Sequence, residues 1–336
     1  MRIDLSACWC CALLAACALS ACGCDEKPDP GGGSGASGNQ AGSAGEAGAA
    51  GSAGEAGLNE SDAAYYARWP MPNSAGLGLP NPADYDAEAT PGVVHDRVTG
   101  LDWLQDPGTE LYARADAISR CSELSFAGFD DWRVPAFIEL VSLFDELPNQ
   151  ADPNVPIYIA PIFRAEGRFW STSPISADGL GRLLDFTADG CSSSHSCSMG
   201  VRAPADSPLG SAFCVRSSEP PAAAARYELD GDRVTDLHTG LVWQTVPAQA
   251  QTGAYTDALS ACAALGDGTR LPSITELLSI LVPILDKRAF PNWPSDAFAW
   301  TSSAIPVKPD NYWVAAIGGA TRAVLSTTHN RVQCVR

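Results

Sequence analysis

Apolar and polar positions divide the chain into three parts. Residues 5–21 carry no charge and are mostly Ala, Leu and Cys, whereas residues 27–61 are rich in Gly, Ala, Ser, Pro and Glu and nearly lack bulky apolar side chains. From about residue 93 to the end, apolar residues return at the spacings of helices and strands. We therefore expect the folded body to begin near residue 93.

Two helices are predicted in each half of this body. The apolar residues of the first helix recur every three or four positions, which places Cys121 and Cys262 on buried faces. The second helix follows an Arg-x-Pro sequence, and Ser273 to Glu276 fits a capping box, whereas Ala136 replaces the capping Ser in the first half. The apolar positions are Leu111, Ala115, Ile118, Cys121 and Leu124, then Tyr255, Ala258, Leu259, Cys262 and Leu265, and Leu277, Leu278, Ile280 and Leu281 in the last helix.

Short strands are predicted around these helices. Residues 227–229 and 233–236 flank Asp230-Gly231-Asp232, which is typical of a β-hairpin. Helices early and antiparallel strands late in each half predict an α+β fold class. The other expected strands are residues 94–97, 101–105, 169–172, 241–244, 312–317, 321–325 and 332–336.

The body carries one sequence pattern twice. Five landmarks recur in the same order, which predicts a tandem pair of homologous domains. The pairs are Thr99–Trp103 with Thr239–Trp243, Asp116–Cys121 with Asp257–Cys262, Arg133–Leu140 with Arg270–Leu277, Trp170–Ser173 with Trp300–Ser303, and Cys214–Arg216 with Cys334–Arg336. The expected organisation is a signal peptide at 1–22, a tether at 23–62, an irregular lead-in at 63–92, domains at 93–216 and 227–336, and a linker at 217–226.

The N-terminus resembles that of a bacterial lipoprotein. Leu19-Ser20-Ala21-Cys22 ends the uncharged run and matches a lipobox, in which the Cys thiol is lipidated and becomes the new N-terminus. The run is short for a transmembrane helix. We expect a membrane as partner through Cys22, at the outer membrane or cell surface of the bacterial envelope. An ordinary cleaved signal peptide is the alternative.

The segment after Cys22 is predicted to be a disordered tether. Gly42–Gly48 recurs as Gly51–Gly57, and without bulky apolar groups the segment cannot offset its ordering entropy. A collagen-like stalk is excluded because Gly does not occupy every third position.

The formal net charge of −18 bears on the choice of partner. A strongly acidic surface argues against nucleic acid and other anionic polymers. It favours solubility, and weak cation binding by the surface stays open as an alternative.

Four of the six cysteines of the body follow the repeat. Export permits disulfides, and Cys121 aligns with Cys262 while Cys214 aligns with Cys334. We therefore expect one bridge within each domain, Cys121–Cys214 and Cys262–Cys334. Cys191 and Cys197 have no counterparts and are expected to pair with each other. Paired CxxC spacing is lacking and the histidines are scattered, so no metal or other cofactor is expected.

These motifs together resemble the C-terminal domain family of the Legionella collagen-like adhesin. The residues that carry the resemblance are Asp230–Gln244, Trp132–Pro135 with Glu139-Leu140, the Trp-Ser/Thr runs at Trp170 and Trp300, and the closing Cys-Val-Arg. The resemblance covers about 93–216 and 227–336. It implies an adhesin, whose best-understood member binds sulfated glycosaminoglycans. This chain lacks the collagen stalk and is acidic. The disulfide from first helix to last strand is the connection used by C-type-lectin-like domains, so we expect two domains of that fold.

The motifs themselves have mainly structural interpretations. Trp103, Trp243, Trp170 and Trp300 fall in strand-like positions and are expected to pack in the core. Arg133 and Arg270 precede Pro at a loop-to-helix junction and are expected to bind carbonyls or a carboxylate of their own domain. The histidines, at 95, 195, 238 and 329, have no partner in the other repeat, so no catalytic residue is predicted.

The candidate ligand-binding residues lie in the second repeat. Asp310 and Asn311 offer oxygens to a calcium ion, and Tyr312 and Trp313 offer rings to a sugar. An ordinary solvated loop is the competing interpretation. The sequence thus predicts a non-catalytic envelope protein that binds an extracellular ligand such as a glycan. A structural or assembly protein that binds other proteins is the alternative, and an enzyme of the formylglycine-generating type comes third.

Overall fold

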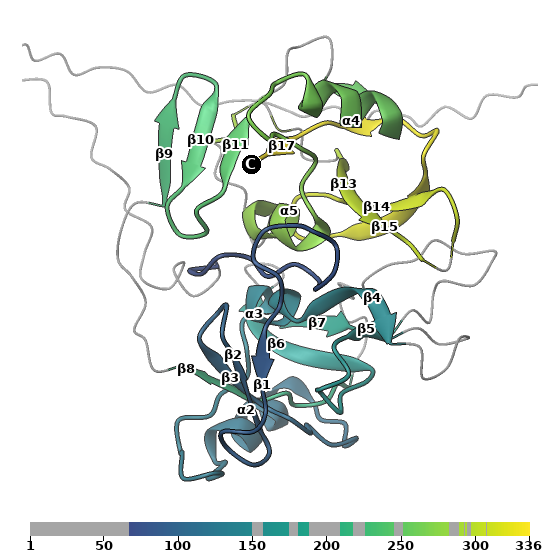
Figure 1. Ribbon diagram of the computed structural model, residues 1–336. Coiled ribbons are helices and arrows are strands. Elements are labelled where there is room, and N and C mark those ends of the chain that lie inside the picture. Colours follow the sequence, from purple (N-terminus) through teal and green to yellow (C-terminus); the bar gives the residue numbers. More distant parts are fainter. Residues whose placement is uncertain are drawn as a thin grey trace, which may run out of the picture. The chain divides into compact units, whose positions relative to one another are not determined.

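The computed structural model describes residues 67–149, 157–174, 181–187, 209–217, 226–244, 251–281, 289–291, 293, 297–306 and 308–336 (Figure 1). The predicted signal peptide with Cys22, the tether, the Cys191–Cys197 pair and most of the linker lie outside these residues. Statements about structure below concern the described residues.

The first repeat contains two helices and three groups of antiparallel strands. β1, β2, β3 and β8 form a sheet in that order, and β4–β5 and β6–β7 form separate pairs. The elements are β1 (Tyr85–Asp86), β2 (Val93–Asp96), β3 (Leu101–Leu104), α2 (Arg114–Ser122), α3 (Phe137–Ser142), β4 (Phe144–Asn149), β5 (Ile157–Ile159), β6 (Arg168–Pro174), β7 (Gly181–Asp185) and β8 (Val215–Ser217).

The second repeat has the same plan with a larger late sheet. One sheet has the order β17-β11-β10-β9 and the other β12-β16-β13-β14-β15. Among the named strands the β13–β16 pair is parallel and the other pairs are antiparallel, so the predicted α+β class with small antiparallel sheets is confirmed for the described part of the chain. The elements are β9 (Tyr227–Asp230), β10 (Arg233–Asp236), β11 (Val242–Gln244), β12 (Thr252–Gly253), α4 (Tyr255–Ala263), α5 (Ile274–Leu281), β13 (Ala299–Ala304), β14 (Asn311–Ala315), β15 (Thr321–Leu325), β16 (Asn330–Arg331) and β17 (Cys334–Val335).

The turn between β2 and β3 explains the repeated Thr-Gly dipeptide. Gly100 has φ +71° and Gly240, between β10 and β11, has φ +75°. This left-handed region is accessible to Gly without steric cost. The aspartate before each turn accepts hydrogen bonds from the turn backbone, from Val98 N to Asp96 at 2.9 Å and from His238 N to Asp236 at 3.1 Å.

The predicted disulfides Cys121–Cys214 and Cys262–Cys334 are both present, each with Cα atoms 5.5 Å apart. Each joins the first helix of its repeat to the closing segment of the same repeat. All four cysteines are buried. The bridges therefore tie helix to sheet within a repeat, as the repeat symmetry indicated.

The first helix of each repeat buries a narrower face than its sequence pattern predicts. Leu111 precedes α2 and is 55% exposed, and Leu259 of α4 is also exposed, whereas Ala117 and Ala258 are buried beside the cystines. Each helix thus contacts the core along a line through an Ala and a Cys. The outer leucines of the predicted stripe remain in solvent.

The range 63–92, predicted as irregular, contains structure that belongs to the body. β1 pairs with β2, and Met71, Asn73 and Ser74 are buried. Apart from β1 and isolated bridges, residues 67–92 consist of turns, bends and irregular backbone, so this segment is largely irregular and nevertheless contributes buried side chains.

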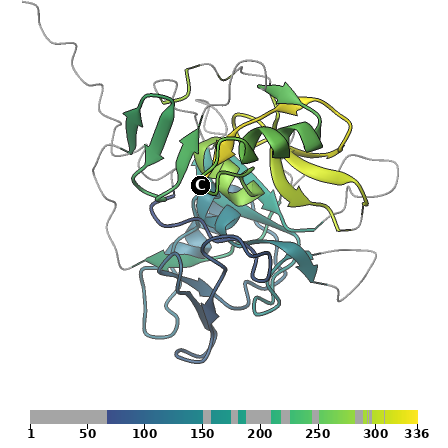
Figure 2. The same cartoon turned by 45° about the horizontal axis from the view of Figure 1, so that its top comes forward.

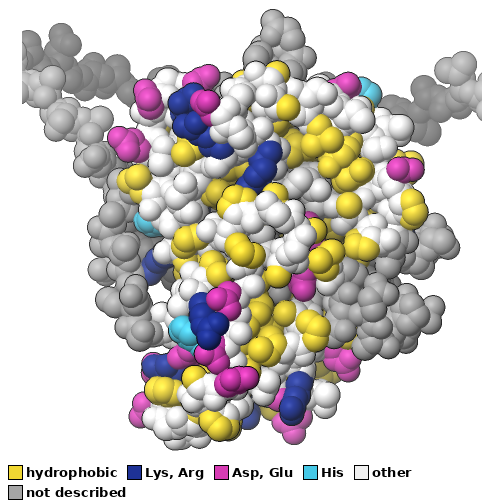
Figure 3. Space-filling model, in the orientation of Figure 1, with side chains coloured by type: hydrophobic (Ala, Val, Ile, Leu, Met, Phe, Trp, Pro, Cys, Tyr) yellow, Lys and Arg dark blue, Asp and Glu magenta, His cyan; other side chains and the backbone are white. Residues whose placement is uncertain are grey.

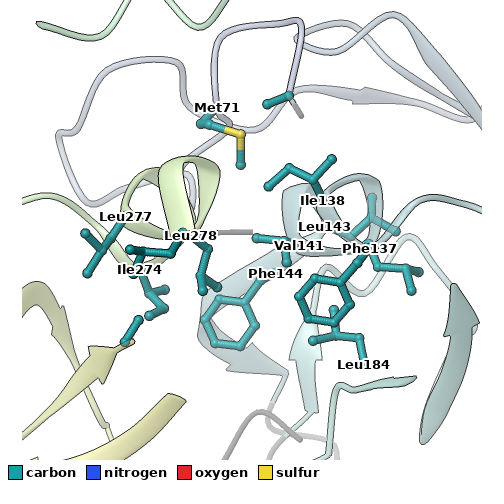
Figure 4. Packing of buried hydrophobic residues seen from close by; sticks show 14 of the residues in the cluster. Met71, Phe137, Ile138, Val141, Leu143, Phe144, Leu184, Ile274, Leu277 and Leu278 are labelled. Atoms are coloured by element: carbon teal, nitrogen blue, oxygen red, sulfur yellow. The ribbon is translucent and has the colours of Figure 1, made fainter. Parts of the chain in front are cut away.

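One hydrophobic cluster contains residues of both repeats. α3 and α5 are buried on all sides, which is the pattern of a helix enclosed within a core. Figure 4 shows Ile274 and Leu278 of α5 packed in one cluster with Val141 of α3 and Phe144 of β4. Two smaller clusters, each around one disulfide, belong to single repeats. The repeats therefore have separate disulfide-linked cores and share a central one.

Candidate functional site

The repeated Arg-x-Pro motif forms an ion pair inside each repeat. The Arg133 guanidinium donates to the two Glu139 carboxylate oxygens at 2.7 and 2.6 Å, and Arg270 donates to those of Glu276 at 2.7 Å each. Both glutamates are buried. Two-point contacts of this kind orient both groups strongly. The prediction that these arginines bind a carboxylate of their own domain is confirmed.

The same glutamates and the Trp-Ser/Thr runs cap the second helix. Glu139 Oε2 accepts a hydrogen bond from Ala136 N at 2.7 Å, and Ser173 Oγ accepts one from Phe137 N at 2.9 Å. The helix start therefore does not depend on a capping side chain at Ala136, because Ser173 supplies the oxygen from β6. In the second repeat the corresponding bonds run from Ser273 N to Glu276 Oε2 at 2.9 Å and from Ile274 N to Ser303 Oγ at 2.8 Å.

The tryptophans of the motifs lie in the core, as predicted. Trp103 and Trp243 are fully buried. Trp170 Nε1 donates to the Tyr112 carbonyl and Trp300 Nε1 to the Gly253 carbonyl, each at 2.8 Å, so these buried N–H groups are satisfied. None of these rings presents a face to a ligand.

The arginine that ends each closing Cys-Val-Arg motif forms an ion pair within its own repeat. Arg216 Nε lies 2.7 Å from Asp131 Oδ1, and Arg336 Nη1 lies 3.3 Å from Asp267 Oδ2. Each aspartate follows the first helix of its repeat. The repeated motifs thus hold helix, loop and closing strand together, and their polar groups are engaged within the protein.

The repeats diverge on the strand after the Trp-Ser/Thr run. Ser171 Oγ donates to the Arg182 carbonyl at 3.1 Å, and Thr301 Oγ1 donates to the Trp313 carbonyl at 2.7 Å, so Arg182 and Trp313 occupy corresponding positions. Trp313 is 1% exposed. Its ring packs edge-on against Phe144 and Tyr158 of the first repeat. Trp313 is therefore a core residue, and the expected sugar-stacking surface does not include it.

The other three candidate residues lie at the start of β14. Asp310 has φ +59°, and Asn311 Nδ2 donates to the Pro309 carbonyl at 3.0 Å. Tyr312 is partly exposed and stacks on Tyr255 of α4, with ring centroids 3.5 Å apart and planes 19° apart. Burial, with a contribution from Tyr312, raises the pKa of the Tyr255 hydroxyl. The pair of stacked rings is a feature that the sequence did not reveal.

A second aromatic contact lies on the same face of the sheet. The Arg322 guanidinium of β15 lies over the Phe298 ring, 3.9 Å from its centroid. In the β14–β15 register Tyr312 faces Val324 and Val314 faces Arg322, so Tyr312 and Arg322 are diagonal neighbours on one face. α4 lies beside these strands in both views (Figures 1 and 2). Hydrophobic side chains gather over α4 and β13 in Figure 3.

The described histidines do not form a nucleophile–base pair. His95 Nδ1 lies 2.7 Å from Asp102 Oδ1 and is 46% exposed on its side chain, and Asp102 also contacts Arg216. Burial, followed by the positive charge of Arg226, lowers the pKa of His238. No serine or cysteine among the described residues hydrogen-bonds either ring. His195 lies outside the described residues.

The described residues contain neither a metal-binding cluster nor a membrane-spanning helix. No group of three or more His, Cys, Asp or Glu side chains is placed to hold a metal ion. No helix in this part of the chain combines the length and apolar character needed to cross a bilayer.

The comparisons with known proteins give a family. The model of the Lcl C-terminal domain matches the chain twice, at residues 92–202 and 232–336. No curated protein and no solved structure matches the chain significantly. The two matches include the Arg–Glu pairs, the capping serines and the helix cysteines of both repeats. With more than half of its length matched in two consecutive copies, the chain belongs to the Lcl C-terminal domain family.

Proposed function

We propose that this protein is a non-catalytic binding or adhesion protein of the bacterial cell envelope, held to the membrane by an acylated Cys22. The family is of adhesin type, which is consistent with a cell-surface protein. The tether at 23–62 would separate the repeats from the membrane surface. An extracellular ligand, a glycan in the leading hypothesis, would then be bound by the repeats.

The main support for this proposal is that the repeated polar side chains form hydrogen bonds within the protein. Arg133, Glu139 and Ser173, and their counterparts in the second repeat, hydrogen-bond each other or the backbone. Side chains that are fixed in this way stabilise the fold, whereas ligand binding is expected from residues outside these motifs. The variable segment between the Trp-Ser/Thr strand and the closing Cys-Val-Arg is therefore the expected recognition face.

A C-type-lectin-like fold is part of the same proposal. In its support, each repeat carries two helices before its late strands and a disulfide from the first helix to the closing segment. That arrangement leaves the segment between β13 and β17 free to vary without loss of the helix-to-strand link.

A role in binding other envelope proteins is the second candidate. Leu229 of β9 and Leu237 after β10 are more than half exposed, and exposed apolar side chains favour protein partners. They belong to the sheet that contains β9 and β10, whereas β13 to β16 of the expected recognition face belong to the other sheet, so the two functions can be tested apart.

Glycan binding distinguishes the two candidates. The full-length protein is applied to an array of immobilised glycans in buffer with calcium and in buffer with chelator. Binding to defined glycans supports adhesion, and its loss with chelator would add calcium as a cofactor. Absence of glycan binding, together with reproducible capture of one envelope protein that Leu229→Asp abolishes, would favour the assembly role.

A further inference from the structure

We propose that the free edge of β9 binds an extended segment of a partner protein as an added antiparallel strand, in which basic side chains alternate with apolar ones. This inference rests on the second candidate function, the binding of other envelope proteins, and specifies the surface and the chemistry of the partner. The edge belongs to the sheet of β17, β11, β10 and β9, and glycan binding by the other sheet is not part of it.

The edge of β9 offers unpaired backbone groups. β9 is the last strand of its sheet, and within the described residues it pairs with β10 alone (Figure 1). The Leu237 N–H donates to the Arg226 carbonyl at 2.7 Å, which fixes the alternation of hydrogen bonds between the two strands. The backbone groups of Glu228 therefore face β10, and those of Tyr227 and Leu229 face away from it. These two residues present N–H and C=O groups to an added strand.

The corresponding edge of the first repeat is shortened by a side chain. Asp86 Oδ1 accepts hydrogen bonds from Glu88 N at 2.9 Å and from Ala89 N at 3.3 Å, so the chain turns and β1 ends at Asp86 after two residues. In the second repeat Gly231, with φ +62°, lies in the tight turn after Asp230, and β9 extends over four residues. The second repeat therefore has a longer edge where the first repeat has a turn.

The acidic side chain on this edge lacks the internal cation that its counterpart has. In the first repeat, Arg97 Nη2 donates to Asp86 Oδ2 at 2.7 Å. The β1–β2 and β9–β10 pairs have the same register, so Glu228 and Leu237 take the places of Asp86 and Arg97. Glu228 is exposed, and no basic side chain of the described residues forms an ion pair with it. Leu237 is 53% exposed and can cover the apolar stem of a partner's arginine. The partner would thus supply the cation that the first repeat supplies itself.

The inner face of β9 adds an apolar contact. Leu229 lies opposite Val234, which is buried in the central cluster, and cross-strand partners share one face of a sheet. Leu229 is nevertheless 56% exposed, since no strand lies beyond it in the described part of the chain. An apolar side chain opposite Leu229 would extend this face. Alternation along the added strand then places its basic side chains on the outer face, beside Glu228.

A second copy of the chain is a poorer occupant of this edge than a basic segment. Two β9 strands would pair through the outward backbone groups of Tyr227 and Leu229. The antiparallel registers that overlap by three residues place Glu228 opposite either Glu228 or Asp230 of the other copy, and like charges directly opposite each other destabilise a sheet. A basic segment is attracted by the same carboxylates and by the net charge of −18.

The test uses the full-length protein and a synthetic peptide of the sequence Val-Arg-Val-Arg-Val, with Val-Glu-Val-Glu-Val as the acidic match. We expect the basic peptide to bind at least about tenfold more tightly, since a charge-assisted hydrogen bond contributes at least that factor. In the added strand the valines lie opposite Tyr227 and Leu229 and direct their N–H groups to β9. N-methylation of the valines should therefore abolish binding, whereas N-methylation of the arginines should leave it unchanged.

Variants of the protein separate the edge from general charge. Leu229→Pro removes an outward N–H, which the edge of a sheet tolerates, and should abolish binding. Leu237→Arg supplies the missing cation within the chain and should weaken binding of the basic peptide. Glu228→Arg should shift the preference to the acidic peptide. Glu88→Arg makes the same charge change at the exposed matching turn of the first repeat and should leave binding unchanged.

The outcomes that overturn this inference are specific to the edge. The circular dichroism spectrum and melting temperature of each variant show whether it is folded. Equal binding of the two peptides, full binding by folded Leu229→Pro, or equal effects of the two N-methylations would each overturn it. A dimer in sedimentation velocity that Leu229→Pro dissociates would assign the edge to a second copy and overturn it as well.

Failure of this inference can be distinguished from failure of the assembly role. If neither peptide binds but capture of an envelope protein depends on Leu229, the inference fails and the assembly role stands. If that capture also fails, the assembly role fails with it.

Discussion

The ring of Trp313 on β14 packs edge-on against the ring of Phe144 on β4, with centroids 6.2 Å apart and planes 87° apart. The two residues belong to different repeats, and both are buried. Tyr158 completes the contact, since it stacks on Phe144 at 5.3 Å and meets Trp313 at 6.2 Å. A side chain that could have served a ligand instead joins the two repeats.

Replacement of Trp313 should therefore destabilise both repeats together. We expect Trp313→Ala to reduce the free energy of unfolding by about 3–5 kcal/mol, the range for removal of a large buried aromatic. Thermal unfolding followed by calorimetry should keep one transition, shifted to lower temperature, because the central cluster is shared. Leu325→Ala, on the exposed part of β15, is the control and should change stability by less than about 0.5 kcal/mol. Two separate transitions in the parent protein would contradict the shared core.

The two Arg–Glu pairs should differ in strength because their arginines differ in exposure. The side chain of Arg133 is 43% exposed and that of Arg270 is 23% exposed, while the glutamates are buried in both repeats. Glu276→Gln leaves a guanidinium with little access to water and replaces one of the two oxygens that accept hydrogen bonds from Arg270, Asn73 and Ser273 with a donor, so we expect a loss of about 3–5 kcal/mol.

Glu139→Gln serves as the matched variant, and its cost should be clearly smaller because water can solvate Arg133. Both values can be measured by urea denaturation. Equal losses in the two variants would show that arginine exposure does not control the strength of the pair.

The sequence predicted several relations between residues of the same repeat. The duplication predicted the disulfides Cys121–Cys214 and Cys262–Cys334, and the place of Arg133 and Arg270 before Pro at a loop-to-helix junction predicted their contacts within their own domain. The capping of Phe137 by Ser173 could not be read from spacing, since the two are joined only through the fold. The helical pattern overestimated the buried face of α2, because helical periodicity does not report how wide the contact is.

Relations between the copies were not accessible from the sequence. An aromatic pattern such as Asp310–Trp313 is equally consistent with a ligand-binding loop and a core strand, and Trp313 belongs to the core while Tyr312 reaches the surface. The contact of Asn73 with Glu276 joins residues far apart in the chain. The contact of Arg322 with the ring of Phe298 likewise joins residues whose proximity the sequence does not show.

Removal of either described disulfide should lower the stability of the whole body. The cystines close sequence separations of 93 and 72 residues, for which loop-closure entropy gives about 4–5 kcal/mol each. We expect Cys121→Ala/Cys214→Ala and Cys262→Ala/Cys334→Ala to cause similar losses by urea denaturation. A double-cysteine variant with unchanged stability would show that its bridge does not form in the protein.

The pairing of Cys191 with Cys197 stays a prediction that peptide mapping can test. Digestion without reduction, followed by mass spectrometry, should yield one peptide set that contains this bridge alone, besides the sets for Cys121–Cys214 and Cys262–Cys334. Reduction should shift all three sets. Recovery of Cys191 bonded to Cys214 would contradict both the local pair and the helix-to-strand link.

The stability of the central region should depend on pH through Glu146 of β4. Its carboxyl group is buried and Oε1 lacks a hydrogen-bond partner within the described residues. Burial raises the pKa of Glu146 to about 7; the negative charges of Glu276 and Asp145 add to this rise, and Ser303 and Arg270 oppose it. The group therefore keeps its proton in the folded state at a pH where the unfolded chain has released it.

The direction in which stability changes with pH follows from proton linkage. Between the unfolded pKa of 4.5 and the folded pKa of about 7, the folded state binds more protons than the unfolded state, so the Glu146 contribution to stability falls as pH rises through this window and is constant above it. The total change is about 3 kcal/mol. Glu146→Gln keeps the neutral shape and removes the titration, so its stability relative to the parent should increase from pH 5 to pH 8. The measurement is urea denaturation of both proteins across this range at constant ionic strength. A constant difference between the two would mean that Glu146 is already ionised in the folded protein at pH 5 and that the central region tolerates its charge.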